Sequence, residues 1–487
     1  MSTIESPKWA VQTGGTGPVL GFGIEYDGVG GALVSGYFSG QASFGSTSLT
    51  SRGAEDAFVM HVTASGAIDW AVQAGGESVT ESNGIAHDGV GGALVTGYFS
   101  GQASFGSTSL TSRGSTDAYV MHVTASGAID WAVQAGGASQ DQGYGIAHDG
   151  VGGALVTGYF SGQASFGSTS LTSRGSTDAY VMHVTASGAI DWAVQAGGAS
   201  QDQGYGIAHD GAGGALVTGY FSGQASFGST SLTSRGTEDA FVMHVTASGA
   251  IDWAVQAGGA SQDQGYGIAH DGAGGALVTG YFSGNASFGS TSLTSRGTEN
   301  AFVMHVTASG AIDWAVQAGG VSQDQGYGIA HDGVGGALVT GYFKGKISFG
   351  STSLTSRGST DAFVMHVTAS GAIDWAVQAG GESVTESNGI AHDGVGGALV
   401  TGYFKGKISF GSTSLTSRGS TDTFVMHVTA SGAIDWAVQT GSSSGGSSAQ
   451  PRALAHDGVG GYLIDHSCFR ARRQRQRHCT HHHQAPL

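Results

Sequence analysis

The sequence predicts an all-β fold made of repeated four-stranded sheets, and three observations support this prediction. The eight tryptophans recur every 61 residues, at Trp9, Trp70, Trp131, Trp192, Trp253, Trp314, Trp375 and Trp436. Each interval holds short runs of β-branched and aromatic residues between glycine-rich turns, and none has the spacing of an amphipathic helix. The chain has 89 glycines and 4 prolines among 487 residues, which suits short strands and tight turns.

One repeat, taken from Gly145 to Tyr205, divides into four strands that we name A to D. They are GIAHD (145–149), ALVTGYF (154–160), AYVMHVT (179–185) and AIDWAVQ (189–195). Four antiparallel strands in a fixed period of this length are typical of a β-propeller blade. We therefore expect a propeller over residues 1–463, followed by a basic, non-repeat tail at 464–487 that we expect to be disordered.

The two ends of the repeat array determine how the ring closes. The chain begins with a strand D at 8–12, runs through seven complete units, and ends with a strand A at 453–457 and part of a strand B at 462–464. Pairing the first strand with the last ones would remove exposed strand edges. We expect eight blades, the eighth composite and incomplete, because the repeat stops after Ile464. Seven blades with unpaired terminal strands are the alternative.

Alternating strands divide the connections between two faces of the ring. The short A–B and C–D turns share one face, which we call the tight-turn face. The B–C connection (161–178) and the D–A connection (196–205) are longer and share the long-loop face. Binding residues usually occur on long loops of a rigid scaffold, so we expect them on the long-loop face.

Three groups of residues on that face are candidates for ligand binding. The B–C connections carry Arg52, Arg113, Arg174, Arg235, Arg296, Arg357 and Arg418. These arginines either pin their own loops by pairing with an acid four residues on, such as Asp117, or bind a glycan or a carboxylate. The D–A connections add Asp141, Asp202, Tyr144 and Tyr205 beside glutamines, a composition that suits sugars. The third group is a basic patch on two adjacent blades, or else ordinary solvated lysines: Lys344, Lys346, Lys405 and Lys407.

Two histidines per repeat form a further set, with His148 in strand A and His183 in strand C as examples. No pair has the close spacing of a metal motif, so we expect neither a metal site nor a cofactor. We expect protonation to place many positive charges on one ring and to lower thermal stability between pH 7 and pH 5. Asp149 and its copies are expected to cap the A–B turns.

Charge and composition restrict the partners. The formal net charge is −17, which argues against nucleic acid or an anionic membrane as a partner of the main body. No apolar run approaches the roughly 18 residues of a membrane helix. The start MSTIESPKWAVQ lacks a secretory signal pattern, and both cysteines lie in the tail, so no disulfide framework is expected. We expect a monomer.

The unit GIAHDGVGGALVTGYFSG…DAYVMHVTASGAIDWAVQAGG resembles the bacterial beta-propeller repeat, itself similar to NHL repeats. The shared pattern is G-I-A-x-D-x-x-G, then D-A-F-V, S-G, and W before G-G, and it extends over nearly the whole chain. The resemblance implies a propeller fold and a secreted or surface-exposed bacterial protein. It implies little about activity, because propellers serve many functions.

Three classes of function remain. The favoured class is a non-catalytic scaffold, such as a lectin or adhesion module, whose repeated weak sites bind a glycan or a protein with avidity. The alternative is a recently amplified structural propeller without a dedicated ligand. A hydrolase or lyase is least favoured, because acid–base catalysis needs two groups in unlike environments and a repeat offers like ones.

Overall fold

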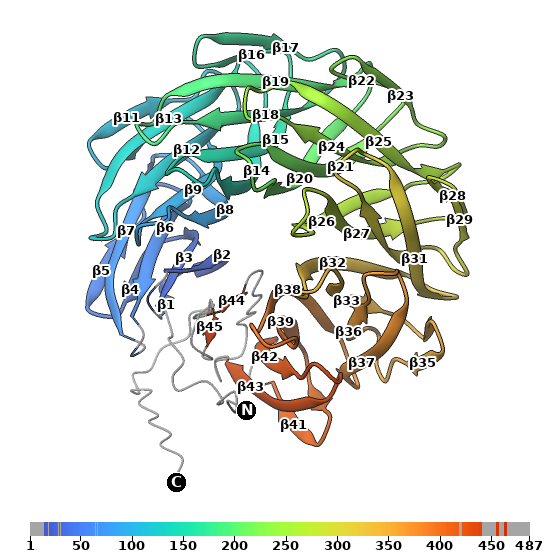
Figure 1. Ribbon diagram of the computed structural model, residues 1–487. Coiled ribbons are helices and arrows are strands. Elements are labelled where there is room, and N and C mark those ends of the chain that lie inside the picture. Colours follow the sequence, from blue (N-terminus) through green and yellow to red (C-terminus); the bar gives the residue numbers. More distant parts are fainter. Residues whose placement is uncertain are drawn as a thin grey trace.

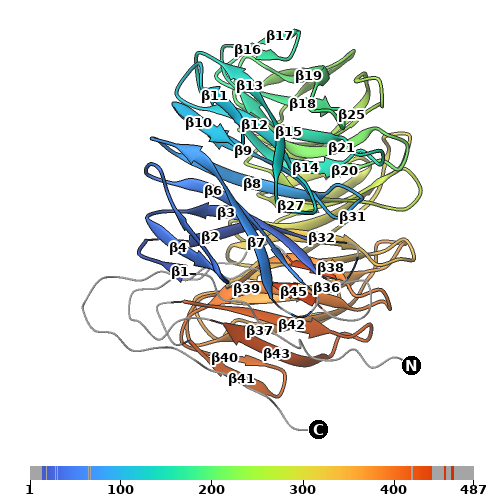
Figure 2. The ribbon, with the colours of Figure 1, turned by 90° about the vertical axis from the view of Figure 1, so that its left-hand side faces the viewer.

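The computed structural model describes residues 14–17, 19–27, 29, 31–63, 65, 67–417, 421–440, 454–456 and 462–464. These residues form an all-β ring of radially arranged sheets, as the sequence predicts (Figure 1). Among them there is no helix long and apolar enough to cross a membrane. The view turned by 90° shows successive sheets stacked one against the next (Figure 2).

Seven blades each contain strands A, B, C and D, paired antiparallel in that order. The seven A strands are β2 (Val19–Tyr26), β8 (Thr80–His87), β14 (Gln142–His148), β20 (Asp202–His209), β26 (Gln264–His270), β32 (Asp324–His331) and β38 (Thr385–His392). They line the central opening in Figure 1. The B strands are β3 (Ala32–Phe38), β9 (Ala93–Phe99), β15 (Ala154–Phe160), β21 (Ala215–Phe221), β27 (Ala276–Phe282), β33 (Ala337–Phe343) and β39 (Ala398–Phe404).

The two outer positions of each blade follow the same repeat. The C strands are β6 (Asp56–Val62), β12 (Asp117–Val123), β18 (Asp178–Val184), β24 (Asp239–Val245), β30 (Asn300–Val306), β36 (Asp361–Val367) and β42 (Asp422–Val428). The D strands are β7 (Ile68–Gly76), β13 (Ile129–Gly137), β19 (Ile190–Gly198), β25 (Ile251–Gly259), β31 (Ile312–Gly320), β37 (Ile373–Gly381) and β43 (Ile434–Thr440).

The B–C connection differs from the expected long loop, because it contains a β-hairpin. Buried residues alternate with more exposed ones in its first strand, and half-buried residues alternate with exposed ones in its second. A glycine with positive φ, such as Gly167 at +60°, forms the turn between them. The hairpins are β4 (Gln41–Phe44) with β5 (Thr47–Thr50), β10 (Gln102–Phe105) with β11 (Thr108–Thr111), β16 (Gln163–Phe166) with β17 (Thr169–Thr172), β22 (Gln224–Phe227) with β23 (Thr230–Thr233), β28 (Asn285–Phe288) with β29 (Thr291–Thr294), β34 (Lys346–Phe349) with β35 (Thr352–Thr355), and β40 (Lys407–Phe410) with β41 (Thr413–Thr416).

Each of these hairpins joins the sheet of the preceding blade. Strand β16 follows β15 in the chain, yet it pairs with β13 through Ala135↔Phe166 and Gly137↔Ala164. Six of the sheets consequently have six strands, two of which come from the next repeat. Neighbouring blades are therefore joined by backbone hydrogen bonds as well as by side-chain packing.

The hydrophobic core lies between successive sheets. One core cluster combines Val120 and Ala135 of the second blade with Phe160 and Tyr180 of the third, and Phe166 of the connecting hairpin completes it. Similar clusters fill the other described seams. Each large apolar side chain contributes about 1.5–3 kcal/mol on burial, so the seams hold the ring together.

The repeated tryptophan fixes each seam at the tight-turn face. The indole of Trp131 stacks on His122 of its own blade, with ring centroids 5.6 Å apart. Its Nε1 donates to the carbonyl of Ala186 in the next blade at 3.2 Å. Gly188 of that turn has φ of +81°, and a Cβ there would lie 2.7 Å from the indole. The indole is thus enclosed between two blades and presents neither face for stacking a sugar.

Short terminal strands lie where the ring closes. Strand β1 (Gly14–Gly15) pairs with hairpin strand β4, with Gly15 opposite Ala42. Strand D of the second blade pairs with its hairpin in the same way, with Gly137 opposite Ala164. Strand β1 therefore occupies the position of a strand D. Strand β44 (Leu454–His456) pairs with β45 (Tyr462–Ile464), and β44 contacts both β38 and β2. These strands occupy the place of a composite blade between the seventh and the first. The count of eight blades stays a prediction, since 8–12 and 465–487 lie outside the described residues.

Two of the described blades bury a tyrosine hydroxyl group that has no protein partner. Tyr119 and Tyr180 are completely buried in strands β12 and β18, and neither hydroxyl makes a hydrogen bond. The same position in the other five blades holds a phenylalanine: Phe58, Phe241, Phe302, Phe363 and Phe424. Leaving a buried polar group unpaired costs about 1–3 kcal/mol.

Replacing Tyr180→Phe should therefore raise the free energy of unfolding by about 1 kcal/mol or more. Guanidinium unfolding followed by tryptophan fluorescence would measure the change. The reverse substitution in the next blade, Phe241→Tyr, is the matched control and should lower stability by a similar amount. A less stable Tyr180→Phe variant would show that this hydroxyl has a partner.

Candidate functional site

The histidine of strand C joins two carboxylates in every described blade. Nδ1 of His183 lies 2.7 Å from Asp191 Oδ1 in strand D, and Nε2 lies 2.9 Å from Asp149 Oδ2 in the A–B turn. The same two contacts recur at His61, His122, His244, His305, His366 and His427, at 2.7 Å and 2.8–3.0 Å. Each of these imidazole rings therefore lies within hydrogen-bonding distance of two carboxylates, one at either ring nitrogen.

The same contacts shift the pKa values of His427 and Asp149. Burial alone would lower the pKa of His427, but hydrogen bonds to Asp393 and Asp435 outweigh it and raise the pKa. Burial would raise the pKa of Asp149, but the hydrogen bond from His183 and the amides of Val151 and Gly153 lower it. Those amides donate to Asp149 Oδ1 at 2.8 Å, which confirms the predicted turn cap.

The strand A histidine has a structural role. His148 Nε2 accepts a hydrogen bond from the amide of Gly152 at 2.9 Å, and its ring lies against Gly89 of the preceding blade. No group of three or more His, Cys, Asp or Glu side chains in the described part of the chain is arranged to hold a metal ion.

The arginines of the long-loop face are held by their own blades. The Arg174 guanidinium donates from Nη1 to the carbonyl of Gly197 at 2.9 Å, and its Nη1 lies 3.9 Å from Asp178. Arg113 and Arg235 make the same pair of contacts. About half of each side chain stays exposed, with 46% for Arg174. The loop is therefore pinned as one hypothesis predicts, while part of each guanidinium faces solvent. Arg418 lies outside the described residues.

The aspartates of the D–A connections are buried, contrary to the expectation that they face a ligand on a loop surface. Asp141 is 1% exposed and accepts hydrogen bonds from the amides of Gly137 at 2.7 Å and Ser161 at 3.0 Å. Asp202 does the same in the next blade. Burial raises the pKa of Asp141 to about 6 and that of Asp202 to about 7. Each of these carboxylates links the end of a strand D to the serine that precedes the adjoining hairpin.

The four lysines are exposed at the hairpins of two neighbouring sheets. Lys344 and Lys346 lie at the start of β34, whose partner is β31, and Lys405 and Lys407 lie at the start of β40, whose partner is β37. Because the hairpins join the preceding blades, this basic patch sits one sheet earlier than the repeat order suggests. It nevertheless remains on two adjacent sheets.

Tyr144 and Tyr205 lie in strand A, where a β-bulge turns them toward the ring axis. The register of β14 against β15 shifts between Gly143 and Gly145, so Tyr144 has no partner in the ladder. A bulge re-aims the side chain of its extra residue. Every described A strand has this shift, at Phe22, Asn83, Tyr144, Tyr205, Tyr266, Tyr327 and Asn388. Of these residues, Phe22, Tyr144, Tyr266 and Asn388 line the central channel.

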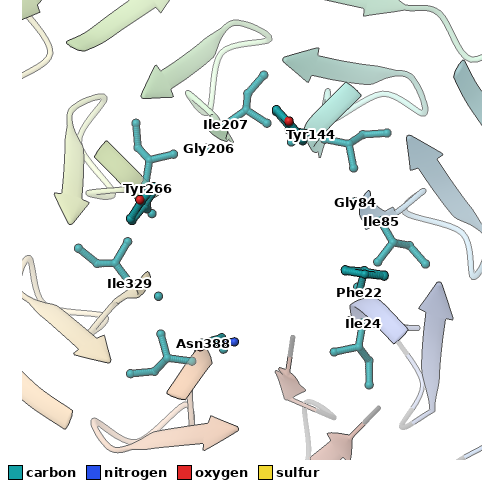
Figure 3. A pocket seen from close by; sticks show the side chains of 18 of the residues that line it. Phe22, Ile24, Gly84, Ile85, Tyr144, Gly206, Ile207, Tyr266, Ile329 and Asn388 are labelled. Atoms are coloured by element: carbon teal, nitrogen blue, oxygen red, sulfur yellow. The ribbon is translucent and has the colours of Figure 1, made fainter. Parts of the chain in front are cut away.

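The glycine after each bulge permits the inner strands to come close together. A Cβ on Gly145 would lie 2.8 Å from the carbonyl oxygen of Tyr205 in the next blade. The strands line an open central channel that holds a cavity of about 320 Å³ (Figure 3). A ring of isoleucines lines this cavity: Ile24, Ile85, Ile146, Ile207, Ile268, Ile329 and Ile390.

The channel has two unlike halves, although the blades are nearly identical. Tyrosines of strands A and B form a continuous belt over four blades, with neighbouring ring centroids 5.5–5.7 Å apart: Tyr144, Tyr159, Tyr205, Tyr220, Tyr266, Tyr281, Tyr327 and Tyr342. Asn83 and Asn388 replace tyrosine in the other half. Nearby, burial and a contact with Glu81 raise the pKa of Glu55 to about 7.

Sequence reasoning missed this asymmetry. Its signal is the variant ESVTESN at 77–83 and 382–388, where the central units have ASQDQGY. The Asp–His–Asp contact was also missed, because its three residues come from one turn and two strands.

The contacts of His427 and the burial of Asp202 and Asp263 predict a pH dependence opposite to the one expected from the sequence. A histidine with a raised pKa stabilises the fold below its ordinary value, and that stabilisation is lost as the pH rises through the folded pKa. Asp202 and Asp263, whose pKa burial raises to about 7, also favour the fold at low pH, with the effect lost between about pH 4 and pH 7. The melting temperature should therefore be higher at pH 5.5 than at pH 8.5.

Differential scanning calorimetry at constant ionic strength would measure this difference. The double variant Asp202→Asn/Asp263→Asn should show a smaller change between pH 5 and pH 7, because two titrating groups are removed. A melting temperature that falls between pH 7 and pH 5 in the unmodified protein would contradict the structural interpretation.

Comparisons with known proteins agree with this architecture. Residues 130–159, 191–220 and 252–285 match the family described as "Beta-propeller repeat". A search of curated proteins gave no match. Among solved structures, the chain is similar to a protein of unknown function from Bacteroides caccae (12% identity, TM-score 0.33, covering 66% of this chain and 89% of that one).

Two further structural matches have similar scores. The Neurospora crassa Pan2 WD40 domain has 11% identity and a TM-score of 0.39, covering 78% of this chain and 85% of that one. A europium-containing methanol dehydrogenase has 12% identity and a TM-score of 0.39, covering 84% and 79%. The repeat matches, together with the recurring four-stranded sheets, confirm the resemblance to the beta-propeller repeat that the sequence shows.

Proposed function

We propose that this protein is a non-catalytic, multivalent binding scaffold whose long-loop face takes an acidic glycan. The observation that carries the proposal is the identical presentation of one arginine per blade. In six blades the Nη1 atom donates to a glycine carbonyl at 2.9–3.1 Å: Arg52, Arg113, Arg174, Arg235, Arg296 and Arg357. A polymer with a regularly spaced carboxylate could contact several of these guanidinium groups at once.

The loop that carries each arginine is fixed before any ligand arrives. Ser173 and Gly175 lie on either side of Arg174. Ser173 Oγ accepts a hydrogen bond from the amide of Gly162 at 2.8 Å and donates one to the carbonyl of Gly175 at 3.1 Å. The amide of Arg174 itself donates to Asp178 at 3.1 Å. A fixed loop lowers the entropy lost on binding, which favours a weak site that is used many times.

The buried acids near the arginines make this binding depend on pH. Asp202 lies close enough to Arg174 to interact with its charge, and burial raises the pKa of Asp202 to about 7. Protonation of Asp202 below that value removes a negative charge beside the guanidinium. An anionic ligand should consequently bind more tightly at pH 5.5 than at pH 7.5.

Binding of polygalacturonate, measured by biolayer interferometry at low salt, would test the proposal, with neutral dextran as the comparison polymer. The triple variant Arg113→Gln/Arg174→Gln/Arg235→Gln should bind polygalacturonate about tenfold more weakly, because each exposed ion pair contributes about 0.2–1 kcal/mol. Val151→Gln, at an exposed position on the tight-turn face, is the control and should bind like the unmodified protein.

Equal binding by the triple variant and the unmodified protein would refute the arginine site. Failure to bind either polymer would support the alternative, a structural propeller without a glycan ligand. Loss of the pH effect with retained binding would show that the arginines act without the buried acids.

A further inference from the structure

The side chains that line the central channel are mostly apolar, and one carboxylate lies among them. Among the described residues that line the cavity, Glu25 is the only one with an acidic or basic side chain. The remaining lining is isoleucine, glycine, the aromatic rings of Phe22, Tyr144 and Tyr266, and the amide of Asn388. Figure 3 shows the labelled side chains arranged around the opening.

Glu25 is a departure from the repeat. The equivalent position in the other six described A strands is alanine: Ala86, Ala147, Ala208, Ala269, Ala330 and Ala391. A side chain that carries a charge thus replaces a methyl group at one point of the ring. Phe22 precedes it by three residues, about 10 Å along an extended strand, and stands where the central units have tyrosine.

These surroundings disfavour an isolated negative charge. Burial raises the pKa of Glu25 to about 7, because partial loss of hydration disfavours the charged carboxylate. A cation beside Glu25 would restore the lost electrostatic stabilisation. The aromatic rings attract a cation through their faces, and the isoleucine ring accommodates apolar substituents.

We propose that the central channel binds an organic cation with apolar substituents, whose charge lies beside Glu25 and whose apolar part contacts the isoleucine and aromatic rings. The cavity of about 320 Å³ is of the size that small-molecule ligands use. This site is separate from the arginines of the long-loop face, and its existence does not depend on the proposed glycan.

The charge requirement can be tested on the unmodified protein with two molecules of the same shape. Phenyltrimethylammonium carries the charge, and tert-butylbenzene is its neutral isostere. Ligand-observed NMR should show that the cation binds one site per chain, at least about tenfold more tightly than the neutral molecule. Affinity for the cation should rise between pH 6 and pH 8 as Glu25 ionises, with no change for the neutral molecule.

The position of the charge is tested by variants. Glu25→Gln should weaken binding of phenyltrimethylammonium at least about tenfold and leave binding of tert-butylbenzene unchanged. Glu77→Gln removes the same charge from an exposed position outside the channel, and it should leave both affinities unchanged. Ala86→Glu, which adds a second carboxylate in the next blade, should increase affinity for the cation.

Three results would overturn the proposal. They are equal affinity for the two isosteres, unchanged cation binding in Glu25→Gln, and no binding of phenyltrimethylammonium at millimolar concentration. The isostere comparison needs no variant, so a folding defect in Glu25→Gln would not prevent a decision. Failure of the glycan experiment would leave all of these outcomes unaffected.

Discussion

Contact between neighbouring sheets is the constraint on which the whole structure depends. The large apolar side chains lie between blades, so a single repeat has no complete core of its own. The hairpin from the next repeat adds backbone hydrogen bonds across the same seam. Side-chain burial and strand pairing therefore both act at the contact between neighbouring blades. This contact fixes the orientation of each blade, and with it the place of the residues on its surface.

The inner strands show how a uniform scaffold can carry different chemistry in each blade. The bulge and the glycine after it are the same in all described A strands, so the backbone around the channel is nearly symmetric. The bulged residue itself changes between blades, from phenylalanine to asparagine to tyrosine, while this backbone arrangement is retained. Functional asymmetry is thus concentrated at a few channel positions, and the seams keep the residues that stability requires.

Much of the fold was accessible from the sequence because its signals are local. Strands A to D, the two faces and the cap at Asp149 follow from alternation and turn residues within short segments. The hairpin at 163–172 was interpreted as a loop because its partner strand, β13, lies in the preceding repeat. Likewise, the sequence predicts the contact between Arg174 and Asp178, because they are only four residues apart. The Gly197 carbonyl that accepts from the guanidinium could not be predicted, because its position depends on the register of β18 against β19.

Hairpin exchange leaves the array with two complementary ends. Among the described strands, the sheet of β38, β39, β42 and β43 lacks a donated hairpin, while β4 and β5 have only the two residues of β1 as their partner strand. A repeat array of any length built on this plan would expose an acceptor edge at one end and a donor hairpin at the other. Meeting of these ends within one chain would give a closed disc, and meeting between chains would give a head-to-tail filament.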